Sequence, residues 1–298
     1  MFLLALIEAK ESGKTLRVVC TILPIYSLTL NVVGKTPGIQ VELLLPGHQG
    51  CPHNYDLTPG DLIKLKRADL IVANGLGMEK FLDQFINKTG AKAPIILAAE
   101  KIEPVLTRPV QNRLSIKKTK TASAHEHDDK ANGHAWVSPK AAAFMVQTIA
   151  EGLARQDPDH AQEYRFNGHR YSVKLNGLAQ QMKEVVSRAK NKKVIVSHDV
   201  LAYLARDIDL TIIGIIQAQP GVEPSLRDLA RLVKVVKDLQ PTAIFSEPQY
   251  SDKVALALSK ETGVPIFEFD PVATGKPAAD TYERIMKRNL EILRIAIK

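Results

Sequence analysis

The feature that most constrains the fold is an alternation of strands and helices that occurs twice, on either side of one long helix-compatible stretch. Parallel strands need helical crossovers, so this alternation favours a parallel sheet covered by helices in each half. In the first half, four short apolar runs are predicted strands: Leu16–Thr21, Val41–Leu45, Asp69–Ala73 and Pro94–Ala98. In the second half the predicted strands are Lys193–Ser197, Thr211–Ile216, Thr242–Ser246 and Pro265–Phe269.

Few helix-breaking residues occur between Pro158 and Lys190. A helix of this length would span roughly 45 Å, enough to run from one lobe to another. The predicted fold is therefore α/β, with two Rossmann-like lobes built on parallel sheets and joined by one long backbone helix. The expected divisions are an N-terminal lobe at 15–157, the linking helix at 158–190 and a C-terminal lobe at 191–298.

Composition indicates a folded protein outside the nucleic-acid-binding classes. Hydrophobic residues make up 45% and charged residues 24% of the 298 residues, and no apolar run reaches the roughly 18 residues of a membrane span. The net charge is +8, but the Lys and Arg are scattered and aromatics are only 5% of the chain, so stacking platforms for bases are few. The GxxxxGK[ST] phosphate loop of an ATPase does not occur.

Three further features bear on location and chemistry. The apolar start MFLLALIEA resembles a truncated or atypical signal peptide. Two cysteines, Cys20 and Cys51, are too few for a disulfide framework, and free thiols are favoured over a single bridge. A polar loop at about 119–133, which contains His125 and His127, is expected to be mobile.

Residues of metal-binding type follow the predicted strands. His53 lies beyond Val41–Leu45, and His198, Glu247 and Asp270 each end or follow a strand of the second half. His134 lies just before the helix that starts at Ser138-Pro139. Ligands of open parallel sheets bind beyond the carboxyl ends of the strands, so these residues predict a metal site in the cleft between the lobes.

Three imidazoles with one carboxylate suit tetrahedral zinc, whereas magnesium and calcium prefer oxygen ligands. Manganese tolerates mixed nitrogen and oxygen ligands and stays open as an alternative. If protein fills all four positions, the site binds metal without activating a water. A zinc-dependent hydrolase, with water in the fourth position, is the alternative from another class.

Five ordered segments resemble the cluster A-I solute-binding proteins of zinc and manganese ABC importers. The segments are Gly50–Pro59, His134–Pro139, Val196–Asp199 with Tyr203–Ala205, Phe245–Gln249, and Phe269–Val272. The resemblance runs from about Leu16 to the end of the chain. The second segment departs from the usual pattern, because Gly133 and Ser138 stand where proline and aspartate are common.

The resemblance implies an extracytoplasmic binding protein, periplasmic or at the cell surface, that is not an enzyme. It would carry Zn²⁺ to the membrane permease of an ABC importer, and we expect a monomer. His53, His134 and His198 would be ligands, with Asp270 as the fourth and Glu247 as the alternative fourth ligand. His198 favours zinc, although a manganese- or iron-specific member stays open. His125 and His127 could hold a second ion.

Overall fold

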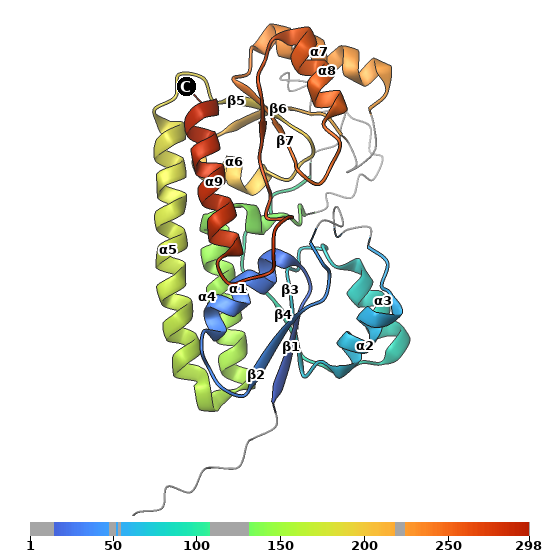
Figure 1. The fold of residues 1–298 in the computed structure, drawn as a ribbon, viewed down its shortest axis with the longest axis vertical. Helices are drawn as coiled ribbons and strands as arrows, with labels where there is room; N and C mark the ends of the chain where they lie inside the picture. The colour runs from blue at the N-terminus through green and yellow to red at the C-terminus, as the bar shows by residue number, and fades with distance from the viewer. Residues whose placement is uncertain (1–14, 48–51, 53–54, 108–130, 218–223, 298) are drawn as a thin grey trace, which may run out of the picture.

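The structure is a computed structural model that describes residues 15–47, 52, 55–107, 131–217 and 224–297. It contains two four-stranded sheets with strand orders β2-β1-β3-β4 and β6-β5-β7-β8, and every strand pair within them is parallel. The two sheets lie in separate lobes along one side of a long helix (Figure 1). The predicted α/β fold of two parallel-sheet lobes is confirmed. In the part of the chain described, no helix is long and apolar enough to cross a membrane.

The first lobe follows the predicted order of elements. Its strands and helices are β1 (Leu16–Cys20), α1 (Leu23–Val33), β2 (Ile39–Leu43), α2 (Pro59–Arg67), β3 (Leu70–Ala73), α3 (Lys80–Thr89) and β4 (Ile95–Leu97). Helix α2 begins at Pro59, because Thr58 and Asp61 form a reciprocal capping box and Pro59 occupies the first turn.

A pair of helices forms the backbone of the molecule. After the short 3₁₀ turn η3 (Ala135–Val137), α4 (Pro139–Gln156) runs beside α5 (Ala161–Ser187), with η4 (Pro158–His160) between them. Ser138 caps α4 by accepting the N–H of Ala141 at 3.3 Å. The 27 residues of α5 correspond to roughly 40 Å, and the helix passes both sheets (Figure 1).

The second lobe repeats the alternation, and its last helix returns to the first lobe. Its elements are β5 (Lys193–Val196), α6 (Ala202–Ile208), β6 (Thr211–Ile215), α7 (Leu226–Leu239), β7 (Ala243–Ser246), α8 (Lys253–Thr262), β8 (Ile266–Glu268) and α9 (Thr281–Ala296). Helix α9 packs against α5 and α1. The carbonyl of Ala279, just before α9, accepts the Ser27 hydroxyl of α1 at 2.9 Å.

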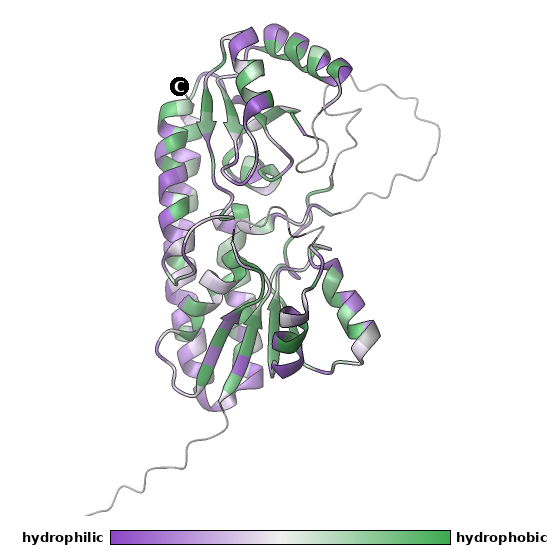
Figure 2. Cartoon of the chain, turned by 45° about the vertical axis from the view of Figure 1, so that its right-hand side comes forward, coloured by the Kyte–Doolittle hydropathy of each residue, from purple (hydrophilic) through white to green (hydrophobic). Residues whose placement is uncertain are grey.

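Hydropathy follows these layers. The inner strands β3 and β7 are hydrophobic and buried along their length, whereas the edge strand β2 carries Gln40 and Glu42, and the helices carry hydrophilic outer surfaces (Figure 2). One core cluster runs through the first sheet, α4, α5, α9 and part of the second sheet. A smaller cluster lies between the second sheet and the helices α7 and α8. The expected division of the chain at 157 and 190 stays a prediction.

Candidate metal site

Three residues of metal-binding type follow the strands of the second sheet. His198 lies two residues beyond β5, Glu247 lies directly after β7, and Asp270 lies two residues beyond β8. All three are buried, with 4%, 4% and 2% of their surfaces exposed. Because β5, β7 and β8 are parallel neighbours in that order, their carboxyl ends bring these residues to one edge of the sheet.

His198 and Glu247 form a direct pair. Nδ1 of His198 lies 2.6 Å from Oε1 of Glu247, and both side chains are almost fully buried. The other carboxylate oxygen, Oε2, accepts a hydrogen bond from Nε2 of Gln249 at 2.8 Å. The ring of Tyr250 stands edge-on to the His198 ring, with centroids 5.6 Å apart. The contact therefore sets the Nδ1 edge of the His198 ring against a carboxylate.

His134 approaches this pair from the other lobe. It lies immediately before η3, and its ring centroid is 5.2 Å from that of His198 and 5.3 Å from that of Trp136. Its Nδ1 lies 2.9 Å from Oδ1 of Asn132. The rings of these two histidines, which lie far apart in the sequence, are therefore close together, and their role as metal ligands stays a prediction.

Asp270 lies in a tight turn next to the His134 segment. Its Oδ1 accepts the N–H of Ala273 at 2.8 Å, and its Oδ2 accepts the hydroxyl of Thr274. Val272 in this turn has a φ of 62°, which is rare for a β-branched residue. The indole of Trp136 donates to the carbonyl of Pro271 at 2.7 Å, so the Asp270 turn and the His134 turn are fastened together.

A buried carboxylate supports the first lobe behind His134. Glu79 accepts the hydroxyl of Thr21 at 2.8 Å and the N–H groups of Asn74 and Gly75 at 2.7 and 3.0 Å. Burial raises the pKa of Glu79, and these hydrogen bonds act in the opposite direction. The Asn74 side chain then donates to the carbonyl of Gly133, next to His134, at 2.8 Å.

The structure brings together His134, His198 and Glu247, and it places Asp270 in the adjoining turn. His53, His125 and His127 lie outside the described residues, as does Cys51, while Cys20 is a buried free thiol. Within the described ranges, no group of three or more His, Cys, Asp or Glu side chains is arranged to hold a metal ion.

Sequence reasoning missed Asn132 and the positioning of His198 by Glu247. Asn132 lies two residues before the predicted ligand His134, and Glu247 is itself predicted as an alternative fourth ligand. The signal for Asn132 was a short polar residue within reach of a candidate ligand.

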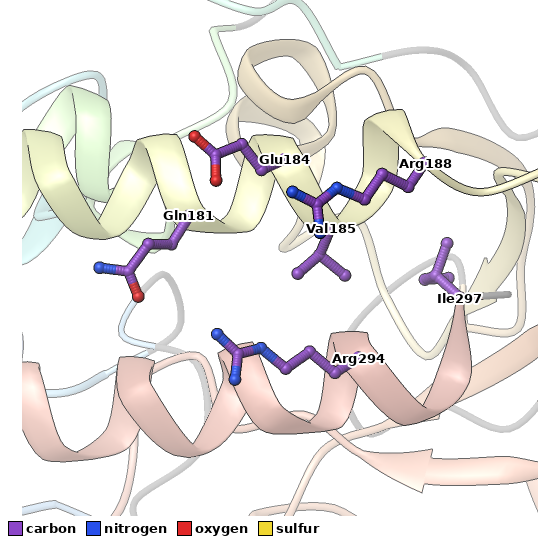
Figure 3. Close-up of a pocket in the computed structure, with 6 residues that line it drawn as sticks. All are labelled: Gln181, Glu184, Val185, Arg188, Arg294 and Ile297. Carbon is purple, nitrogen blue, oxygen red and sulfur yellow. The ribbon is translucent and has the colours of Figure 1, made fainter.

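Away from the histidines, a cavity of about 300 Å³ lies between the C-terminal ends of α5 and α9. It is lined by Gln181 and Glu184 of α5, by Arg188 directly after α5, and by Arg294 of α9 (Figure 3). None of His134, His198, Glu247 and Asp270 lines this cavity, so it is separate from the candidate metal site.

Comparison with known proteins agrees with this arrangement. The model of a family described as the periplasmic component A of zinc-uptake complexes matches residues 18–296. The high-affinity zinc uptake system protein ZnuA of Bacillus subtilis is 30% identical over 291 residues, which cover 96% of this chain and 89% of that protein. The zinc-binding lipoprotein AdcA of Streptococcus pneumoniae is 28% identical over 298 residues, but the chain spans only 58% of its length.

A similar solved structure is that of the SBP FpvC from Pseudomonas aeruginosa in complex with Ni²⁺. It superimposes with a TM-score of 0.80 at 26% sequence identity, covering 95% of this chain and 97% of that one. The likeness therefore extends over both lobes and the long helix.

Proposed function

The chain belongs to the family of periplasmic zinc-uptake components, and from that premise we propose that it is the extracytoplasmic binding protein of a metal ABC importer. It takes up one Zn²⁺ and delivers the ion to a membrane permease, acting as a monomer in the periplasm or at the cell surface. The zinc-named relatives ZnuA and AdcA support this reading.

One observation carries the proposal. Two buried imidazoles from different lobes have ring centroids 5.2 Å apart. The Nδ1 atom of each ring lies next to a side-chain oxygen, that of Asn132 for His134 and that of Glu247 for His198. We propose that the Nδ1 edge of each ring faces its oxygen neighbour and that Nε2 of each ring is the metal-binding atom. We assign His53 as the third imidazole and Asp270 as the fourth ligand.

The choice of Asp270 over Glu247 follows from what each carboxylate contacts. Glu247 holds the Nδ1 side of His198, which is the position of an outer-shell partner in a carboxylate–histidine–zinc triad. Asp270 is fixed by donors of its own turn, the N–H of Ala273 and the Thr274 hydroxyl, which is how ligating carboxylates are oriented. The loop holding His125 and His127 would be an additional, weaker zinc site.

A fully coordinated ion leaves no water to activate, so we propose binding and release in place of catalysis. The hydrolase alternative requires a water in the fourth position, where this proposal puts Asp270. A crystal structure of the zinc-loaded protein decides between them, because a bound Asp270 supports transport and a bound water supports hydrolysis.

The direct test is zinc titration of the His198→Ala protein against a chelator of known affinity. Loss of an outer-shell partner costs roughly 10- to 100-fold in affinity, so loss of a ligand should cost more. His169→Ala is the matched control, because His169 is exposed on α5, and it should bind like the unaltered protein. Equal affinities of the two variants would overturn the ligand assignment.

The metal itself needs a separate measurement, because FpvC was solved with Ni²⁺ and the family resemblance includes manganese carriers. Competition between Zn²⁺ and Mn²⁺ in the purified protein should favour zinc, since imidazole-rich sites follow the order of increasing affinity from manganese toward zinc. Preferential retention of manganese or iron would support the alternative carrier.

A further inference from the structure

Asn132 is a buried side chain whose polar atoms are all engaged around the two described histidines. Only 2% of its surface is exposed. Its Oδ1 lies 2.9 Å from both the main-chain N and the ring Nδ1 of His134. Its Nδ2 donates to the carbonyl of Asp199 at 2.6 Å.

Two main-chain groups fix the orientation of this amide. The N–H of His134 requires an acceptor, and the carbonyl of Asp199 requires a donor. A flipped amide would set two donors against each other at His134 and two acceptors at Asp199. The carbonyl oxygen of Asn132 therefore faces the His134 ring, so Nδ1 must carry the proton and Nε2 the lone pair.

The same side chain links the two lobes next to the candidate ligands. Asp199 directly follows His198, so the bond from Nδ2 ties the His134 turn to the His198 turn. The main chain of Asn132 is held as well, because its carbonyl accepts the hydroxyl of Tyr203 at 2.8 Å and its N–H donates to Val105 at 2.7 Å. One amide thereby sets both the tautomer of one histidine and its distance to the other.

We propose that Asn132 is a positioning residue for metal capture. It selects the Nδ1–H tautomer of His134, and it holds the His134 turn in a fixed position relative to the His198 turn. This inference rests on the proposed function for its consequence in metal binding. The tautomer of His134 is a property of the metal-free protein, so it can be measured whether or not zinc is the cargo.

Two substitutions separate the two roles. Asn132→Asp retains an oxygen that accepts from the N–H and Nδ1–H of His134, but it puts a second acceptor against the Asp199 carbonyl. Asn132→Ala removes both contacts. Asn74→Ala is the matched control, because Asn74 is a buried amide that holds the same turn through Gly133 and contacts neither ring through any hydrogen bond described.

The readouts are the His134 tautomer, from long-range proton–nitrogen NMR of the metal-free protein, and the zinc Kd from chelator competition. Asn132→Ala should lose the single tautomer and raise the Kd roughly 10- to 100-fold. Asn132→Asp should keep the tautomer and still bind more weakly than the unaltered protein, and it serves as the test if the alanine variant does not fold.

The proposal is overturned if Asn132→Ala keeps the Nδ1–H tautomer, or if its loss of affinity does not exceed that of Asn74→Ala. Unaltered zinc affinity in a folded Asn132→Asp protein overturns the role of Asn132 in positioning the two histidine turns. If the unaltered protein itself does not bind zinc, the proposed function fails, while the NMR result still tests the tautomer.

Discussion

Replacing Glu247 with alanine should weaken zinc binding without removing a ligand. The Nδ1–Oε1 distance to His198 is 2.6 Å, and the two side chains are 5% and 2% exposed, so water cannot readily replace the lost carboxylate. Loss of an outer-shell partner of a metal-ligating histidine typically costs roughly 10- to 100-fold in metal affinity, so the zinc Kd should rise by that factor, which is about 1.4–2.8 kcal/mol.

The assay is chelator competition at a fixed pH, with thermal melting to show that the variant is folded. Glu268→Ala is the control, because Glu268 is a half-exposed carboxylate of the same sheet that pairs with Arg288 and should not affect binding. Cobalt(II) substitution then reports coordination: the visible spectrum of a four-coordinate site should persist in Glu247→Ala and change in Asp270→Ala. An unchanged Kd, or a spectral change in the Glu247 variant alone, would refute the reasoning.

Three further predictions concern the scaffold. Gly152→Ala should destabilise the protein by about 1–3 kcal/mol in thermal melts, because a Cβ there overlaps Ile96, whereas Gly177→Ala meets no atom and should stabilise α5 by up to about 1 kcal/mol. Burial raises the pKa of the Cys20 thiol to about 12, so in a Cys51→Ser protein it should react with a thiol reagent at pH 8 only on unfolding. Because the pKa of Glu79 is raised in the folded protein, its protonation stabilises the fold below the unfolded-state pKa of about 4.5, and this stabilisation is lost as the pH rises through the folded-state pKa. The stability of the unaltered protein relative to Glu79→Gln should therefore fall with rising pH. A stability difference that does not change with pH would contradict this prediction.

Local chemistry allowed the start of one helix to be predicted. Helix α4 begins at Ser138-Pro139, as predicted, because a capping hydroxyl and a proline act within a few residues. The strand predicted at Val41–Leu45 is shifted in the structure to Ile39–Leu43. An apolar run in the sequence indicates burial and does not show where strand pairing ends. The last pair of this ladder is Leu43 with Cys20, and Leu44 and Leu45 are buried beyond it.

The sequence predicted which residues gather at the strand ends better than it predicted what each of them does there. Positions after parallel strands indicated His198, Glu247 and Asp270 because the sheet itself brings strand ends together. The roles of Glu247 and Asn132 depend on which nitrogen of a ring each one meets, and that is set by contacts between segments far apart in the chain. Asn132 meets Asp199 at a separation of 67 residues, a contact that no local pattern encodes.

The two cores bear on how the ion would leave. Along β5, Val194 and Val196 belong to the core shared by both lobes, while Ile195 belongs to the smaller core under α7 and α8, as the period of a strand requires. Turning one lobe away from the other would therefore have to open the shared core, including the buried bond from the Trp136 indole to the carbonyl of Pro271, at 2.7 Å. We therefore expect metal release without a wide separation of the lobes.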